Sequence, residues 1–169
     1  PDTPERLGAQ AAALWSRRDE VPGGARVLGL HLEGPFVNPE RAGALPPDRL
    51  VAPSPAALKA LLGSSSAEGR GIRQLTVAPE LPGARELIAE LTHLGVRVSL
   101  GHSAASALEA GHGADAGARG ATYLFNAMSG IHHREATLAS FALAEDALVA
   151  EVIGDLVHVG REALRIALR

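Results

Sequence analysis

The sequence predicts an α/β fold made of parallel strands, and within that class part of a barrel. Short apolar runs alternate five times with helix-length segments, which is typical of βαβ units. Each run ends in polar residues, and none is followed by the Gly-x-Gly-x-x-Gly of a dinucleotide-binding sheet. A parallel barrel gathers its active site at the C-terminal ends of many strands, whereas a doubly wound sheet concentrates its site at one switch point. Because a closed barrel needs eight strands, five strands predict a partial barrel.

The first predicted elements are a helix, a strand and a proline-rich loop. Apolar residues recur at helical spacing over residues 4–18, and a pair of glycines follows. A strand is predicted over 26–31. Six prolines in the next segment exclude a regular helix or a central strand there. A short helix is predicted over 56–62, before the polar loop GSSSAEGRG.

Four further strand–helix pairs are predicted after that loop. The predicted strands are IRQLTVAPE, VRVSLGHS, ATYLFNAMS ending at Asn126, and LVAEVIGDLVH ending near Asp155 and His158. The helix after each strand is predicted, in order, over 84–94, from residue 104, near 138–144 and from Arg161.

Composition limits the class of protein. The chain has 169 residues, 46% of them hydrophobic, and a net charge of −3, which suits one domain with a sizeable core. It lacks the clustered basic excess of a nucleic-acid surface and the run of about 20 apolar residues of a membrane span. PDTPERLGAQ lacks the layout of a secretion signal, so we expect a cytoplasmic protein. Since the sequence lacks an initial methionine and ends in a helix-like run, we expect residues 1–169 to be part of a single barrel domain truncated at both ends.

An acid and an imidazole stand at two of the predicted strand ends. Glu33 follows an apolar run, where an ionised carboxylate without a partner is costly, so either a cation lies there or the strand ends in solvent. His102 follows the run VRVSL. Taken singly, Glu33 could be a solvated or capping carboxylate and His102 a structural hydrogen-bonding group. Together they are half of a plausible zinc site, since a catalytic zinc has three protein ligands and an open position for water. The absence of cysteine leaves His and carboxylates as the metal ligands.

Six short segments, taken together, resemble one known family. HLEGPF, LTVAPE, SLGHS, LFNAMS, HHRE and IGDLVH occur in the order found in the N-acetylglucosamine-6-phosphate deacetylases of the amidohydrolase superfamily. The resemblance implies a (β/α)8 TIM-type barrel of the metal-dependent amidohydrolase kind, of which this chain holds about five βα units. It also implies hydrolysis of the acetamido group of N-acetylglucosamine 6-phosphate to glucosamine 6-phosphate and acetate. One divalent metal, zinc or iron, and a homodimer are expected from the family.

The resemblance also assigns roles to individual residues. Glu33 and His102 fall on two metal-ligand positions, and Tyr123 falls on the third. His158 would contact the substrate and polarise the carbonyl that is attacked. Substrate-binding positions fall on Ala44, Asn126, Ala127, Arg134, Asp155 and His158. Arg134 matches an arginine that reaches the phosphate of a neighbouring subunit's substrate, for which a guanidinium is well shaped. The plainer alternatives are that Asn126 caps a helix and that Arg134 is a solvated charge.

Three departures from the family pattern bear on activity. The family has histidine where this chain has Tyr123, and a phenol with an ordinary pKa of about 10 is a poor replacement, so weak metal binding or none is expected. The family also has histidine where this chain has Leu45, which removes a polar contact to the sugar. The Thr-Asp-Ala motif of the catalytic base does not occur in the sequence, so we expect this chain alone to be inactive.

Three functional hypotheses therefore stay open. The first is a segment of a sugar-phosphate deacetylase with a partly eroded site. The second is a non-catalytic sugar-phosphate-binding or structural barrel fragment. The third is a metal-free barrel isomerase acting on sugar phosphates, which explains Tyr123 but gives no reason for the HLEGP and GHS segments.

Overall fold

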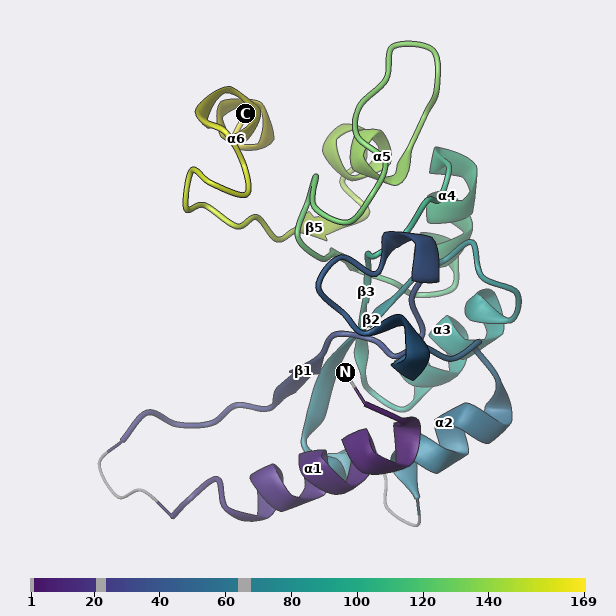
Figure 1. Cartoon of the computed structure of the whole chain (residues 1–169), viewed down its shortest axis with the longest axis vertical. Coiled ribbons are helices and arrows are strands. Elements are labelled where there is room, and N and C mark those ends of the chain that lie inside the picture. Colours follow the sequence, from purple (N-terminus) through teal and green to yellow (C-terminus); the bar gives the residue numbers. More distant parts are fainter. Residues whose placement is uncertain (1, 21–23, 64–67) are drawn as a thin grey trace.

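Five parallel strands form one sheet in the computed structural model, which describes residues 2–20, 24–63 and 68–169. The strands are β1 (Leu30–Leu32), β2 (Ile72–Val77), β3 (Arg97–Leu100), β4 (Gly120–Ala121) and β5 (Val149–Ala150). They lie side by side in chain order, which confirms the predicted parallel α/β architecture (Figure 1). Connections between neighbouring parallel strands are right-handed, so the connecting helices all lie on one face of the sheet. The opposite face forms the inside of a barrel wall.

The predicted helices are present, with small shifts at their ends. They are α1 (Pro4–Ser16), α2 (Pro55–Leu62), α3 (Ala84–His93), α4 (Ala107–Asp115), α5 (Leu138–Ala144) and α6 (Arg161–Ala167), with 3-10 turns η1 (Pro39–Arg41), η2 (Pro47–Arg49) and η3 (Glu68–Arg70). Helix α4 begins three residues later than predicted. Ser106 accepts the N–H of Glu109, and the Glu109 side chain accepts the N–H of Ser106, so this capping box fixes the start. No helix in the described part of the chain has both the length and the apolar character that crossing a membrane requires.

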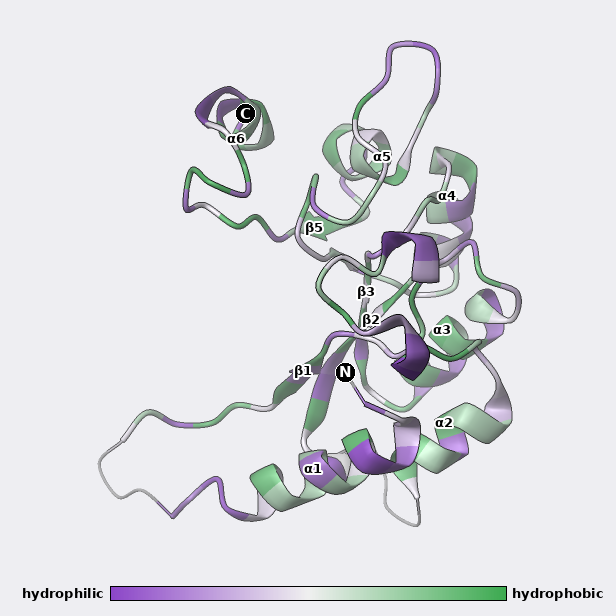
Figure 2. Ribbon diagram, viewed as in Figure 1, coloured by the Kyte–Doolittle hydropathy of each residue, from purple (hydrophilic) through white to green (hydrophobic). Residues whose placement is uncertain are grey.

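The core lies between the sheet and its helices. Alternate residues of β2 and β3 enter it, and Leu75, Val77, Val98 and Leu100 are completely buried there. Burying each such side chain stabilises the fold by about 1.5–3 kcal/mol. Figure 2 shows how the hydrophobic and hydrophilic residues are distributed, with the loop that projects between β4 and α5 largely hydrophilic.

The strand predicted over 26–31 is wrong in extent. Strand β1 begins only at Leu30, whose N–H donates to the carbonyl of Gly71 at 2.8 Å. Its neighbour β2 begins at Ile72, so residues before Leu30 lie beyond the start of the partner strand. Val27 and Leu28 are accordingly exposed.

The strands predicted over ATYLFNAMS and LVAEVIGDLVH are also too long. Strand β4 ends at Ala121, and Tyr123, Phe125 and Ala127 have φ of 52°, 75° and 50°. A strand needs negative φ, so three alternate left-handed residues curl this segment into turns. Leu124 is nevertheless completely buried, which accounts for the apolar pattern that suggested a strand. Strand β5 similarly ends at Ala150, and residues 154–158 are exposed.

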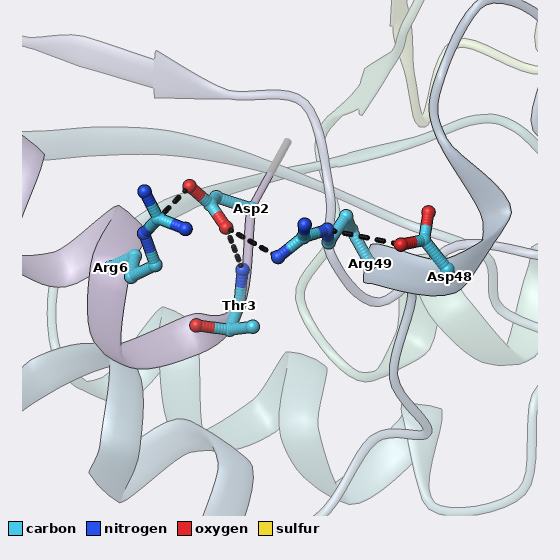
Figure 3. Close-up of polar contacts among 5 residues, drawn as sticks. All are labelled: Asp2, Thr3, Arg6, Asp48 and Arg49. Atoms are coloured by element: carbon cyan, nitrogen blue, oxygen red, sulfur yellow. Dashed lines mark hydrogen bonds and ion pairs between the residues drawn. The ribbon is translucent and has the colours of Figure 1, made fainter.

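An ion-pair cluster joins the start of α1 to the loop after β1. The Asp2 carboxylate contacts Arg6 Nε at 3.2 Å and Arg49 Nη1 at 3.3 Å, and it accepts the N–H of Thr3 (Figure 3). Arg49 also contacts Asp48 at 3.2 Å. The cluster connects the first helix to η2.

Candidate active site

Glu33 and His102 meet where β1 and β3 end. His102 Nε2 lies 2.7 Å from Glu33 Oε1. The ring is almost fully buried, whereas a third of the Glu33 side chain is exposed. The acid at the end of the apolar strand is therefore paired with an imidazole.

The other nitrogen of His102 fixes its tautomer. Nδ1 lies 2.9 Å from the carbonyl oxygen of Arg41. A carbonyl only accepts hydrogen bonds, so Nδ1 carries a proton and Nε2 is the nitrogen presented to Glu33. Metal-binding histidines are commonly oriented by this kind of outer contact. At 2.7 Å, Nε2 and the carboxylate are joined by a hydrogen bond, and a cation between them would require the two groups to move apart.

The backbone of His102 is held in the left-handed region. Its φ is 48°, a conformation that costs a residue with a side chain roughly 1–2 kcal/mol. Its carbonyl accepts the N–H of Asn38 at 3.0 Å, and the next N–H, of Ser103, donates to the carbonyl of Ala127 at 3.0 Å. These contacts join His102 to the loops that follow β1 and β4.

Tyr123 follows β4 and is half-buried near this pair. Burial raises the pKa of its phenol, and the Glu33 and Glu151 carboxylates raise it further. The side chain is therefore a neutral phenol at neutral pH, as its residue type suggested.

A three-ligand metal centre fits this donor set only in part. Glu33 and His102 are suitable donors, although two ligands of a tetrahedral zinc lie about 3.3 Å apart, so the pair would have to open by about 0.6 Å. The third position offers the neutral phenol of Tyr123. Within residues 2–20, 24–63 and 68–169, no group of three or more His, Cys, Asp and Glu side chains is arranged to hold a metal ion. The residues present do not complete a metal site.

A row of polar side chains crosses the inner face of the sheet beside the pair. His31 Nε2 lies 2.9 Å from Thr76 Oγ1, which lies 2.9 Å from Thr122 Oγ1. Gln74 of β2 donates to Glu151, which directly follows β5, so this contact passes over β3 and β4. Partial burial lowers the pKa of His31, although the carboxylates of Glu151 and Glu33 oppose this shift. Period-2 alternation in IRQLTV could have placed Gln74 and Thr76 on one face, but sequence reasoning did not select them.

Two of the predicted substrate-binding segments lie next to His102. A Cβ added to Gly43 would lie 3.6 Å from the Ala127 side chain and 3.7 Å from His102 Cε1, so the loop carrying Ala44 passes over both.

The Asn126 side chain donates to the carbonyl of Leu124 at 3.3 Å. It caps none of the described helices, which removes the capping alternative for Asn126.

The remaining predicted residues lie on exposed segments. Arg134 is in the loop before α5, where its N–H donates to His132 Nδ1. His158 Nδ1 lies 2.6 Å from Asp155 Oδ2. The segment that carries Asp155 and His158 leads away from the sheet toward α6 in Figure 1. In the described residues, none of these side chains hydrogen-bonds to Glu33 or His102, so their site roles stay predictions.

Asp155 organises the turn that presents His158. Backbone N–H groups of His158 and Val157 and the His158 ring donate to its carboxylate, and they lower the pKa of Asp155 to about 2. Since Nδ1 of His158 is used in this contact, Nε2 is the ring nitrogen left to face a ligand.

Leu45 takes a structural position. It is buried in a small apolar cluster with Val37, Ala42 and Ala78. Its side chain therefore packs inward within the loop after β1.

Known proteins similar to this chain agree on one family. The chain is 40% identical over 145 residues to N-acetylglucosamine-6-phosphate deacetylase of Lysinibacillus sphaericus, covering 86% of this chain and 37% of that protein. It is 38% identical over 143 residues to N-acetylgalactosamine-6-phosphate deacetylase of Escherichia coli O157:H7, covering 85% and 37%. A solved structure of a mutant N-acetyl-D-glucosamine-6-phosphate deacetylase from Mycobacterium smegmatis, in complex with N-acetyl-D-glucosamine-6-phosphate, superposes with a TM-score of 0.88 at 31% identity. That match covers 99% of this chain and 42% of the other. No protein-family model matches the chain.

The chain is thus similar, over most of its length, to a segment of proteins named N-acetylglucosamine-6-phosphate deacetylase. It spans about 37% of the length of the curated relatives that it matches. The five-stranded parallel sheet is therefore the fold that the solved deacetylase structure shares with this chain. Relatives at similar identity carry the names of two epimeric substrates, so this similarity alone does not fix the sugar.

Proposed function

We propose that this chain supplies the strand-end face of a deacetylase that acts on an N-acetylated amino-sugar 6-phosphate. The observation that carries the proposal is the 2.7 Å contact between Glu33 and His102 at the ends of β1 and β3. Those residues belong to the HLEGP and GHS segments through which the chain resembles the family. The reaction would release acetate and the free amino-sugar phosphate, in a cytoplasmic protein whose residues 1–169 belong to one barrel domain.

The substrate would lie across the loops that follow the strands. Asn126 and Ala127 would contact the sugar phosphate, and the loop with Ala44 would cover it. His158, oriented by Asp155, would donate or accept a hydrogen bond at the acetamido carbonyl. Arg134 would reach the phosphate of a neighbouring subunit's substrate in a homodimer, which agrees with its exposed position before α5.

A divalent metal, zinc or iron, is the cofactor that the family implies, and Tyr123 is the residue that decides its occupancy. We expect purified native protein to take up little Zn²⁺ and the Tyr123→His variant to bind about one equivalent, because a neutral imidazole replaces a neutral phenol as third donor. Elemental analysis after equilibrium dialysis measures this. Adding Glu33→Gln to Tyr123→His is the control, and it should remove the gained metal. Equal occupancy in native protein and Tyr123→His would refute the proposal.

A second function is favoured by Tyr123 and by the burial of Leu45: binding of the sugar phosphate without hydrolysis. Calorimetry with N-acetylglucosamine 6-phosphate and N-acetylgalactosamine 6-phosphate, run beside an acetate-release assay, separates the two functions. Acetate release supports the deacetylase. Because the Thr-Asp-Ala base motif does not occur in this sequence, binding without acetate release supports the second function only when residues 1–169 are tested within a complete deacetylase barrel that supplies the base. The two sugars differ at one hydroxyl, so their relative affinity reports which epimer the site prefers.

A further inference from the structure

The Glu80 carboxylate ties together the loops after β1, β2 and β3. Its Oε1 accepts hydrogen bonds from Asn38 Nδ2 at 2.9 Å and from the N–H of Ala104 at 2.7 Å, and its Oε2 accepts from Ser103 Oγ at 2.7 Å. A carboxylate has about four acceptor positions, so three of them are used by the protein itself. Glu80 therefore has a role within the protein, although it stands at a strand end as Glu33 does.

One side of this contact set controls the backbone of His102. Ser103 and Ala104 directly follow His102, and Ser103 is completely buried. Ser103 Oγ donates to Glu80 and accepts the N–H of Ala105 at 2.9 Å. These bonds fix the chain just after a residue whose φ is 48°.

The other side controls the ring of His102. Asn38 Nδ2 donates to Glu80, while Asn38 Oδ1 accepts the N–H of Glu40 at 2.9 Å and so caps η1. The last residue of η1 is Arg41, whose carbonyl accepts the Nδ1 proton of His102. The Asn38 N–H also donates to the His102 carbonyl. The Glu80 carboxylate is thus connected to His102 in two ways, through Ser103 and Ala104 and through Asn38.

We infer that Glu80 is a positioning residue, which sets the left-handed backbone and the ring orientation of His102 and thereby aims Nε2 at Glu33. Hydrogen bonds to charged groups are stronger than those between neutral groups, and the three bonds to Glu80 together offset the backbone strain at His102. Charge-assisted bonds are also short and directional, which suits a residue that must hold a ring in place. The inference rests on the proposed function for the importance of His102, but its first test needs no activity.

The first test follows the His102 Nδ1 proton by NMR at fixed pH. Because this proton is buried and hydrogen-bonded to Arg41, it should give a downfield resonance that exchanges slowly with water; a His102→Gln variant assigns it. In Glu80→Ala we expect the exchange to become at least tenfold faster. In Glu80→Gln, the amide oxygen can accept from Asn38 Nδ2 and the Ala104 N–H, and the amide nitrogen can donate to Ser103 Oγ. We therefore expect the exchange rate of the His102 Nδ1 proton to stay within about twofold of the native rate.

The matched control is Glu90→Ala, which removes an exposed glutamate on α3. It should leave the resonance unchanged even where it lowers the melting temperature. The inference is overturned if Glu80→Ala leaves exchange at the native rate, or if Glu80→Ala and Glu90→Ala change it equally. Should Glu80→Ala not fold, Ser103→Ala removes the bond to Oε2, together with the acceptor of the Ala105 N–H, and leaves both bonds to Oε1 in place. Faster exchange in Ser103→Ala then supports the inference, and native exchange in it contradicts the inference.

A second readout uses the Tyr123→His background. Loss of an outer contact to a metal-binding histidine typically weakens metal affinity 10–100-fold, so Glu80→Ala should do so in that background and Glu80→Gln should not. If Tyr123→His binds no Zn²⁺, the proposed metal site fails while the NMR test of Glu80 still stands. If metal binds and Glu80→Ala leaves its affinity intact, the positioning role fails instead.

Discussion

His102 shows how much of this site depends on one residue's surroundings. Its ring is nearly fully buried, its backbone is left-handed, and both of its nitrogens are in contact with named oxygen atoms. Tyr123 lies close enough to the Glu33 carboxylate for that charge to affect its phenol. The charge of the Glu33 carboxylate therefore acts directly on the side chain at position 123.

The single tyrosine makes a direct measurement possible at this scale. Because burial and the carboxylates raise the pKa of Tyr123, the absorbance change of phenol ionisation should have its midpoint above pH 10. Glu33→Gln should move the midpoint down toward 10, since it removes one of the charges that oppose phenolate. A raised pKa in the folded state means that this group's contribution to stability is complete below about pH 10 and is lost as pH rises through the folded value. A midpoint at or below 10 in the native protein would contradict this.

At the scale of elements, caps and positive φ values decide where helices and strands stop. The apolar segment after β4 is curled by three left-handed residues, and α4 starts where Ser106 and Glu109 cap it. These features depend on single side chains and backbone torsions, whereas the hydrophobic pattern continues past them.

We expect Ser106→Ala to lower the free energy of unfolding by about 1 kcal/mol, because the N–H of Glu109 loses its acceptor. Urea unfolding measures this. Ser16→Ala, at the exposed C-terminal end of α1, removes only a bond to the carbonyl of Ala13 and should change the free energy by less than about 0.5 kcal/mol. Equal losses in the two variants would argue against the cap.

At the scale of the whole molecule, the sheet order brings distant loops together. The Glu33–His102 contact joins residues 69 positions apart, and the Gln74–Glu151 contact joins residues 77 positions apart. The cluster around Asp2 similarly fastens the first helix to η2 (Figure 3).

Asp2→Asn should lower the free energy of unfolding by about 0.5–1 kcal/mol, since it removes a largely buried carboxylate that both Arg6 and Arg49 contact. Asp48→Asn is the matched control, because Asp48 contacts the same Arg49 from a largely exposed position and should change little. Denaturant titration in low and high salt checks both, with the Asp2 effect shrinking in salt. An effect of Asp48→Asn as large as that of Asp2→Asn would contradict this account.

Sequence reasoning predicted the architecture and the pair at its centre. The alternation of apolar runs and helical segments predicted five parallel strands, and the strand-end rule selected Glu33 and His102, which the structure places in contact. The same rule applied to LTVAPE would have drawn attention to Glu80. It could not show that Glu80 faces the loops of two other strands, because that depends on how the loops fold back.

The fold class, the family resemblance and the residue types at each strand end could be read from the sequence, since all three follow from local pattern and side-chain chemistry. The ends of the strands, the nitrogen of His102 that faces Glu33 and the burial of Leu45 became clear only from the folded chain. Those outcomes depend on partners that are far away in the chain, and no local pattern records a neighbour's position.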